Sequence, residues 1–337
     1  MDGVVTRTAL RARGACWSLS ALAVTIALAS ALTTACAQSD YPTRPVRIVI
    51  GFAAGGGNDI LARLVGQRLS QLIGQPVVIE NRAGAGGRLA AEYVSHQAAD
   101  GYTLLLGASG ATSIASAIYP NLPYRPAETF IPLAMIARFP LFMVIAADHP
   151  ANTVKEVVAW ANAHPDKANY ATTSPAFTIA TELLKLKSGM PGIAIPYRSS
   201  TDMILSVISG QTMTAIADGP PAVPMVKAGK VKAVAVTGAE RAAELPDVPS
   251  MAEAGYPDVD IHLFSGIFAP AATPSAIVAK LEKGLGEAIR DPDVSEKLRA
   301  MAVEPGGGTP EDFKRMIETD IVKYKDVVKA ANLHFEE

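Results

Sequence analysis

Residues 46–73 read VRIVIGFAAGGGNDILARLVGQRLSQLI, and this stretch decides the fold class. The β-branched run at residues 46–52 predicts a buried strand, and the apolar spacing at residues 59–73 predicts an amphipathic helix. A glycine turn joins the two. Because strand, turn and helix in this order are typical of a parallel sheet covered by helices, we expect an α/β fold.

The same alternation continues along the chain. We expect further strands at residues 77–80, 103–107, 169–172, 194–197, 214–218 and 231–237, and helices at residues 87–98, 111–119, 179–187, 274–290, 294–300 and 310–331. The proline-rich passage at residues 120–132 is expected to be a loop. A capping box at residues 153–156 opens a helix near the start of a second lobe.

The strongly helical C-terminal part contains no strand-rich unit of domain size, so we expect it to pack on the first lobe. This predicts a discontinuous first lobe, residues 38–145 plus 263–337, and a second lobe, residues 146–262. The chain would cross between them near residues 146 and 262. Lobes connected twice tend to hinge, and clefts between domains are where ligands usually bind.

Residues 1–37 are predicted to be a signal peptide. Three arginines precede an uncharged run that is shorter than the roughly 20 residues a membrane span needs, and small residues follow it. We therefore expect export to the periplasm, with lipid anchoring at Cys36 as the alternative. Both cysteines, Cys16 and Cys36, lie in this segment, so a mature chain starting at Gln38 has no disulfide.

Composition excludes several classes of function. Of the 337 residues 49% are hydrophobic, which is enough for a sizeable core, and the formal net charge is −2. Without the signal peptide, 27 basic and 31 acidic residues give a net charge of −4. Because basic blocks are missing and aromatic residues are few, we expect no nucleic-acid partner. Metal-ligand spacings and a phosphate-binding loop motif are also missing, so we expect no metal and no cofactor.

The turn after the first strand is the first candidate ligand site. Glycines let backbone N–H groups approach an anion, and the following helix offers free N–H donors and the positive end of its dipole. A tight turn capped by Asn58 or Asp59 is the alternative interpretation. The candidate contacts are Phe52, Ala54, Gly55, Gly56, Gly57, Asn58 and Asp59.

A second glycine-rich segment lies at residues 82–88. Gly84, Gly86 and Gly87 resemble a dinucleotide-binding fingerprint, but Leu89 stands where the third glycine of that motif belongs. The segment also follows the second strand instead of the first. We therefore favour a turn that enters a helix.

Ser109 lies in an imperfect nucleophile elbow at residues 107–111, between a predicted strand and a predicted helix. The hydrolase pattern needs glycine where Ala111 stands, and none of the five histidines lies in a motif with an acid. We therefore favour a Ser109 that binds ligand or caps its helix. A secreted serine hydrolase using Ser109 is the alternative function.

Polar clusters follow three predicted strands of the second lobe, at residues 172–174, 197–200 and 218–219. Ligands of open α/β sheets bind at strand ends. Hydroxyl groups there can hold a carboxylate, and Arg198 can donate two parallel hydrogen bonds to one. Helix capping is the alternative for each cluster.

Ordered fragments over nearly the whole mature chain are similar to the tripartite tricarboxylate transporter substrate-binding proteins, also called Bug receptors. The fragments are YP at 41–42, RPVRI at 44–48, the glycine turn up to Asp59, ENR at 80–82, GAGG at 84–87, DGYTLL at 100–105, YP at 119–120, LPY at 122–124, AVAVT at 233–237, LPDVP at 245–249 and FAP at 268–270. Many ordered fragments are more specific than one loop.

The resemblance implies a two-lobed periplasmic-binding-protein fold of the Venus flytrap, type II class, with two mixed, mainly parallel sheets, flanking helices and a two-strand hinge. It implies a receptor without enzymatic activity. Such a receptor captures a small carboxylate, a di- or tricarboxylate or an aromatic acid, and delivers it to a membrane permease of two subunits. We expect a monomer. A receptor that presents its ligand to a signalling partner is the alternative.

Carried onto this sequence, the family's contacts fall on both lobes. The first-lobe set, where backbone amides and ordered water hold one carboxylate, adds Ser109, Gly110, Ala111 and Thr112 to the glycine turn. The second-lobe set is Thr173, Ser174, Phe177, Thr178, Tyr197, Arg198, Ser199 and Asp218. Arg198 stands where lysine is common, which suggests a second carboxylate on the ligand. Phe177 suggests room for an apolar or aromatic ligand body.

Overall fold

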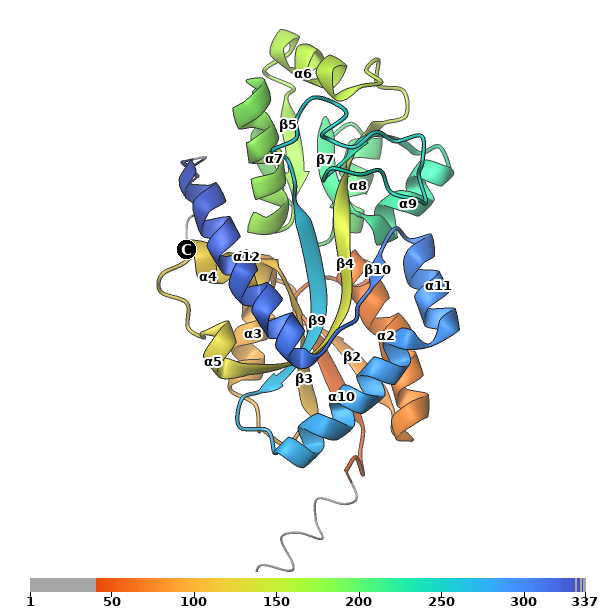
Figure 1. Cartoon of the computed structure of the whole chain (residues 1–337). Helices are drawn as coiled ribbons and strands as arrows, with labels where there is room; N and C mark the ends of the chain where they lie inside the picture. The colour runs from red at the N-terminus through yellow and green to blue at the C-terminus, as the bar shows by residue number, and fades with distance from the viewer. Residues whose placement is uncertain (1–40, 331, 334, 336–337) are drawn as a thin grey trace, which may run out of the picture. The chain divides into compact units, whose positions relative to one another are not determined.

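The computed structural model describes residues 41–330, 332, 333 and 335. The predicted signal peptide and the lipidation site at Cys36 lie outside these residues. The described residues from Arg44 onward form one compact unit. Its strands and helices alternate, which confirms the predicted α/β class (Figure 1).

The first sheet is centred on β1 (Val46–Ile50), which pairs in parallel with β2 (Val77–Asn81) and β3 (Thr103–Ala108). β9 (His262–Pro270) lies antiparallel beside β3 and is followed by β4 (Phe130–Ala146) and the short β10 (Glu304–Pro305). Most of β1 is completely buried. A strand covered on both faces explains the continuous β-branched run from which it was predicted.

Helices from both ends of the chain cover this sheet. Those from the first part are α2 (Gly57–Ile73), α3 (Arg88–Ser95), α4 (Ala115–Ile118) and α5 (Pro126–Thr129). Those from the last part are α10 (Ser275–Arg290), α11 (Pro292–Ala300) and α12 (Pro310–Ala330). Helices α10 and α11 pack against α2, whereas α12 packs on α4 and β4 (Figure 1). The C-terminal helices therefore contact elements of the first lobe.

The second sheet has the strand order β8-β4-β7-β5-β6 within the described residues. Its own strands are β5 (Asn169–Thr172), β6 (Ile193–Pro196), β7 (Thr214–Asp218) and β8 (Val231–Val236). Its helices are α6 (Val154–Ala163), α7 (Pro175–Ser188), α8 (Ser200–Ile208) and α9 (Gly219–Lys227). The second half of β4 is the fifth strand of this sheet.

The long strand β4 was not predicted. The loop expected at residues 120–132 contains α5 and the first residues of β4, so that prediction was wrong. Pro132 lies beside a register shift in the pairing with β9, and Pro140 is the last residue so paired. Proline has no N–H to donate and is tolerated at such irregular positions, so the prolines do not end the strand.

Two extended segments connect the sheets. From Leu141 onward β4 pairs with β7 and β8 of the second sheet. β9 enters the first sheet at His262, and the residues just before it still bond to the second lobe: Thr237 donates its hydroxyl to the Ile261 carbonyl at 2.6 Å. These strands form the expected two-strand hinge, while the predicted lobe boundaries stay a prediction.

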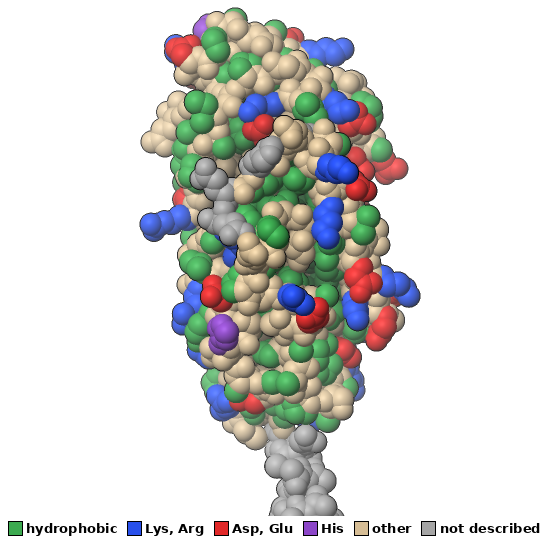
Figure 2. Space-filling view, turned by 90° about the vertical axis from the view of Figure 1, so that its left-hand side faces the viewer, with side chains coloured by type: hydrophobic (Ala, Val, Ile, Leu, Met, Phe, Trp, Pro, Cys, Tyr) green, Lys and Arg blue, Asp and Glu red, His purple; other side chains and the backbone are tan. Residues whose placement is uncertain are grey.

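On the face drawn in Figure 2, neither positive nor negative charge dominates the surface. Lys and Arg are interspersed there with Asp and Glu, and uncharged groups fill the middle of the face. Among the described residues, none of the helices combines the length and apolar character that crossing a membrane requires. In the same part of the chain, no three acidic, His or Cys side chains are grouped as metal ligands.

Candidate functional site

Several helices begin where the two lobes meet. α2 follows β1, and α7, α8 and α9 follow β5, β6 and β7. A π-helical turn, Gly110–Ile114, follows β3. The N-cap residues of α2, α7 and α9 make no side-chain cap, but the first N–H of α2, from Gly57, donates to Ser200, and Pro175, Pro220 and Pro221 have no N–H to offer. Because each N-terminus also carries partial positive charge, this region favours an anion.

The glycine turn at residues 55–57 contacts the second lobe directly. Ala53 donates its N–H to the Arg198 carbonyl at 3.3 Å, and Gly57 donates to the Ser200 hydroxyl at 3.3 Å. In the opposite direction, the Thr201 hydroxyl donates to the Gly55 carbonyl at 2.6 Å. The lobes are therefore closed on each other here, and groups of the second lobe accept two of the donors near this turn.

Close approach explains why glycine is needed at residue 57. A Cβ added there would lie 1.7 Å from the Asp218 Oδ2 atom, and a Cβ at Gly56 would lie 3.1 Å from the Ser199 Cβ. Real Cβ atoms do not approach another atom as closely as 1.7 Å. The glycines allow close approach of the backbone to the opposite lobe, and ligand contact by this turn stays a prediction.

The side chain of Asp59 holds the turn in place. It forms an ion pair with Arg63 at 2.8 Å and accepts the Gly55 N–H at 2.9 Å. Asn81 donates to Asp59 at 3.0 Å and to the Phe52 carbonyl at 3.0 Å. Burial acts to raise the pKa of Asp59, but the hydrogen bonds from Arg63, Gly55 and Asn81 lower it overall. Asp59 is thus kept ionised as part of the scaffold.

Other predicted first-lobe side chains also have partners inside the protein. Asn58 accepts a hydrogen bond from the Ser265 hydroxyl at 2.6 Å. Thr112 donates to the Ala108 carbonyl at 2.9 Å. Ligand contacts by Asn58, Gly110, Ala111 and Thr112 stay predictions. The Thr112 N–H already donates to the Ser109 carbonyl at 3.3 Å.

Ser109 is fully buried and bonded to β9. Its hydroxyl accepts the Phe264 N–H at 2.8 Å and lies 3.4 Å from the Phe264 carbonyl, while its own N–H donates to that carbonyl at 3.1 Å. A serine held this way joins the end of β3 to the hinge strand. The ligand contact predicted for it stays a prediction, and the geometry gives no support to a nucleophile.

The second-lobe wall holds polar atoms without partners. Thr173 Oγ1, Ser174 Oγ and Asp218 Oδ1 are buried and make no hydrogen bond to any described residue. Ser174 Oγ lies 3.1 Å from the place of a Cβ on Gly110, so it faces the first lobe. Buried polar groups are normally paired. The hydroxyl groups of Thr173 and Ser174 can therefore donate to a ligand carboxylate, whereas Asp218 Oδ1, when ionised, can only accept a hydrogen bond.

Asp218 is a buried carboxyl group at the centre of the contact between the lobes. Burial raises its pKa to about 6, while a hydrogen bond with Ser200 acts in the opposite direction. No charged group contributes to this shift. Around neutral pH the site therefore contains a carboxylate that the protein does not neutralise.

The remaining predicted residues of the second lobe differ in their surroundings. Phe177 is buried, Thr178 bonds to the Thr172 hydroxyl at 2.9 Å, and Ser199 caps α8 by accepting the Asp202 N–H at 3.1 Å. Arg198 is exposed, and its guanidinium has no ion pair with a described residue. It is a free cation beside the cleft.

A cavity of about 620 Å³ lies between the two lobes. Its first-lobe wall is Gly51, Phe52 and residues 83–86, and its second-lobe wall is Thr173 and residues 196–198. Four residues predicted from sequence line it: Phe52, Thr173, Tyr197 and Arg198. Its size is in the range of small-molecule sites, about 300–1,000 Å³.

The glycine-rich turn at residues 83–86 was missed as part of the site. Gly84, Ala85, Gly86 and Gly87 have φ of 149°, 48°, 63° and 96°, a conformation for which glycine is suited. A Cβ on Gly86 would lie 3.0 Å from the Ser174 Cβ of the opposite lobe. Glycines between a strand and a helix were the available signal, as at residues 55–57. The expected turn into a helix is present, and it also forms a wall of the cavity.

Comparison with known proteins identifies the family. The model of the tripartite tricarboxylate transporter family receptor matches residues 61–333. The chain belongs to this receptor family. Three solved structures are similar to it. Rhodopseudomonas palustris Rpa4515 with adipate is 34% identical, with a TM-score of 0.84, covering 87% of this chain and 99% of that one.

The other two structures agree with the first. MatC from Rhodopseudomonas palustris, with bound malate, is 32% identical, with a TM-score of 0.82, covering 86% of this receptor and 100% of MatC. The periplasmic binding protein BugD is 30% identical, with a TM-score of 0.84, covering 88% of this receptor and 100% of BugD. They confirm the predicted two-lobed binding-protein fold. Because these relatives are binding proteins, the receptor prediction is confirmed and the hydrolase alternative is not favoured.

Proposed function

We propose that this receptor works in the periplasm, closes on a small dicarboxylate and delivers it to the permease of a tripartite tricarboxylate transporter. The observation that carries the proposal is the cavity between the lobes, which combines the glycine-rich turn at residues 83–86 with Arg198, an arginine that has no ion pair with a described residue. Adipate in Rpa4515 and malate in MatC, both dicarboxylates, support the choice of ligand class.

The two carboxylates of the ligand would be held differently. One would accept hydrogen bonds from free backbone N–H groups at residues 85–86, with the unpartnered hydroxyl groups of Thr173 and Ser174 beside them. The other would pair with the guanidinium of Arg198, whose planar fork suits two parallel hydrogen bonds. Phe52 and Tyr197 would contact the carbon chain between them.

Closure about β4 and β9 would bring these groups together. The hydrogen bonds of Gly55 and Gly57 with Thr201 and Ser200 join the lobes, so opening the cleft must break them. A ligand that contacts both lobes favours the closed form by its differential affinity for it. The permease would then recognise the closed receptor.

The proposal is tested on the mature chain, residues 38–337, purified without ligand. Malate, succinate and adipate are added, with butyrate and succinamide as controls that lack one or both charges. A dicarboxylate should raise the melting temperature because it binds only the folded state; at 1,000 times Kd it adds about 4 kcal/mol to the free energy of unfolding. Neither control should match it. No response to any dicarboxylate, or an equal response to succinamide, would contradict the proposal.

Delivery to a permease is tested separately, in cells. Deleting the gene should abolish uptake of the radiolabelled ligand, and the protein should appear in the fraction released by osmotic shock. Normal uptake without the protein would favour the alternative, a receptor for a signalling partner.

A further inference from the structure

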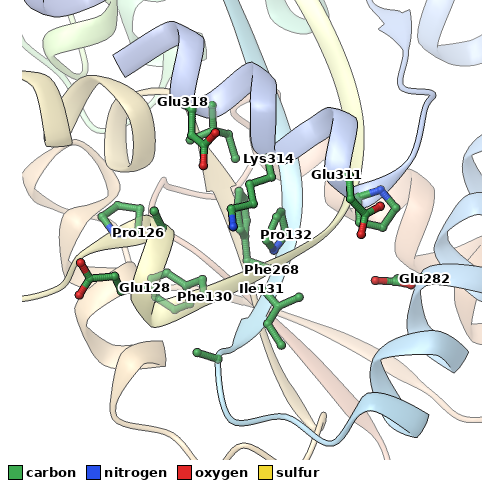
Figure 3. A pocket seen from close by; sticks show the side chains of 14 residues that line it. Pro126, Glu128, Phe130, Ile131, Pro132, Phe268, Glu282, Glu311, Lys314 and Glu318 are labelled. Carbon is green, nitrogen blue, oxygen red and sulfur yellow. The ribbon is translucent and has the colours of Figure 1, made fainter. Parts of the chain in front are cut away.

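A second pocket, the α5–α12 pocket, lies on the first lobe and shares no lining residue with the interlobe cavity. It is bounded by α5, the start of β4, α10 and α12 (Figure 3). Its volume is about 270 Å³. This is below the roughly 300–1,000 Å³ usual for small-molecule sites, so it suits one large side chain better than a whole ligand.

The floor of the α5–α12 pocket is apolar. Phe130, Phe268 and Ile317 line it, and all three belong to the buried core cluster of this lobe. The rings of Phe130 and Phe268 are edge-on, with centroids 6.4 Å apart. A floor supported by packed aromatic rings is preformed, and pockets of this kind hold the anchor side chains of protein interfaces.

The rim is acidic. Glu128, Glu282, Glu311 and Glu318 surround the pocket, and Lys314 is the only base among the lining residues. Figure 3 shows the Lys314 side chain pointing into the pocket from α12. One ammonium among four carboxylates leaves a local formal charge of −3 around an apolar floor.

The rim carboxylates are poorly compensated. Glu128 pairs only with the exposed Arg125, at 3.5 Å, and Glu282, Glu311 and Glu318 have no ion pair with a described residue. Burial raises the pKa of Glu282, and the nearby charge of Glu311 raises it further. An acidic residue in the first turn of α12 is favoured by the helix dipole, but this explains Glu311 alone. A cation entering the pocket would relieve this repulsion.

We infer that the α5–α12 pocket docks a segment of a partner protein in which a large apolar side chain lies next to a lysine or arginine. The apolar side chain enters the pocket onto Phe130 and Phe268. Its basic neighbour pairs with Glu282 and Glu311 at the rim. The inference goes beyond ligand capture, because the docking residues lie outside the cleft.

The test uses the mature chain and capped tripeptides as probes. Acetyl-Lys-Phe-Lys-amide should bind, as measured by saturation-transfer NMR and calorimetry, and affinity should fall as salt rises. Acetyl-Glu-Phe-Glu-amide and acetyl-Lys-Gly-Lys-amide should each bind at least about tenfold more weakly, because they lack the charge or the anchor. Equal binding of the three peptides would overturn the inference.

Paired variants locate the binding. Glu282→Gln combined with Glu311→Gln should weaken Lys-Phe-Lys binding about tenfold. Glu287→Gln, an exposed position on α10 outside the pocket, is the matched control and should change it less than twofold. Equal weakening by both would overturn the inference. A second result would also overturn it: the peptide does not bind, the receptor forms a dimer, and the double variant dissociates that dimer. The occupant of the pocket would then be a second copy of the chain.

A dicarboxylate titration of the same double variant separates this inference from the proposed function. Unchanged dicarboxylate affinity with lost peptide binding supports both the docking inference and the proposed function. Lost dicarboxylate binding in the double variant would overturn the claim that the pocket is independent of the cleft.

Discussion

The two walls of the cleft recognise a ligand with different chemical groups. The first lobe offers two glycine turns: residues 84–86 line the cavity, and residues 55–57 contact the second lobe through backbone atoms. The second-lobe wall offers side chains: the hydroxyl groups of Thr173 and Ser174, the Arg198 guanidinium and the Asp218 carboxyl. Backbone donors suit any carboxylate. Ligand preference must therefore be set by the second lobe, and substitutions in the two walls should fail in different ways.

The largest expected effect is on stability, at the buried acid of the second-lobe wall. Burial raises the pKa of Asp218 from 3.8 to about 6. Because the folded state holds this proton more tightly than the unfolded state, the free energy of unfolding should fall as pH rises from about 4 to about 6. The loss is on the order of 3 kcal/mol. Asp218→Asn should flatten this part of the curve, as measured by urea unfolding at several pH values.

Asp320 provides a matched comparison, because burial also raises its pKa to about 6. Asp320→Asn should remove a similar part of the pH dependence without changing ligand affinity. If the free energy of unfolding of the Asp218→Asn protein fell with pH as steeply as that of the parent, Asp218 would be solvated and the cleft would be open in solution.

On the first-lobe wall, Gly57→Ala should prevent closure. Its Cβ would lie 1.7 Å from Asp218 Oδ2, and overpacking of this kind costs about 1–3 kcal/mol. Dicarboxylate affinity should fall roughly 10- to 100-fold by calorimetry. Gly307→Ala, which has open space around it, is the control and should bind normally. Normal affinity of the Gly57→Ala protein would refute the closed contact between the walls.

Arg198→Ala should separate the two carboxylates of the ligand. Losing a charge-assisted pair should weaken a dicarboxylate about tenfold, while a monocarboxylate of the same length should lose less than about twofold. Arg198→Lys should recover only part of the loss, since lysine cannot donate a planar fork. If both acids lost affinity equally, Arg198 would act through general attraction and would not set ligand preference.

Ser174→Ala should have the smallest effect of these substitutions. Whether it stabilises or destabilises the ligand-free protein is informative. Ser174 Oγ has no partner among the described residues, so its removal should stabilise the ligand-free protein by about 0.5–1 kcal/mol. Affinity should fall about three- to fivefold. Ser206→Ala is the control, because that hydroxyl is bonded to the Met203 carbonyl at 2.7 Å. It should destabilise the protein without affecting binding, and the same outcome for Ser174→Ala would remove Ser174 from the site.

Local pattern was sufficient for most of the fold. The strands at residues 169–172 and 214–218 were predicted with their observed bounds, because β-branched and small apolar residues are flanked by turn residues. β4 was missed because two prolines interrupt its apolar run. What keeps it extended is pairing with β9, more than 100 residues later in the chain, and no local window contains that information.

The candidate site was predicted unevenly for the same reason. Arg198 and Thr173 were identified from strand ends, and both line the interlobe cavity. The turn at residues 83–86 was interpreted only as an entry to a helix, because its contact with Ser174 depends on how the lobes meet. For Ser109, ligand binding or helix capping was predicted, and its bonds to Phe264 were not, because they join segments 155 residues apart. Sequence identified the donor groups but not their partners.

The central claim is that a small dicarboxylate binds between the glycine turns and the second lobe. The most direct test is an amide NMR titration of the mature receptor labelled with 15N at glycine only. A saturating dicarboxylate should shift the amides of residues 55–57, 84 and 86, and leave Gly189 and Gly229, at distant helix ends, unchanged. Binding detected by calorimetry without any shift at these turns would contradict the claim.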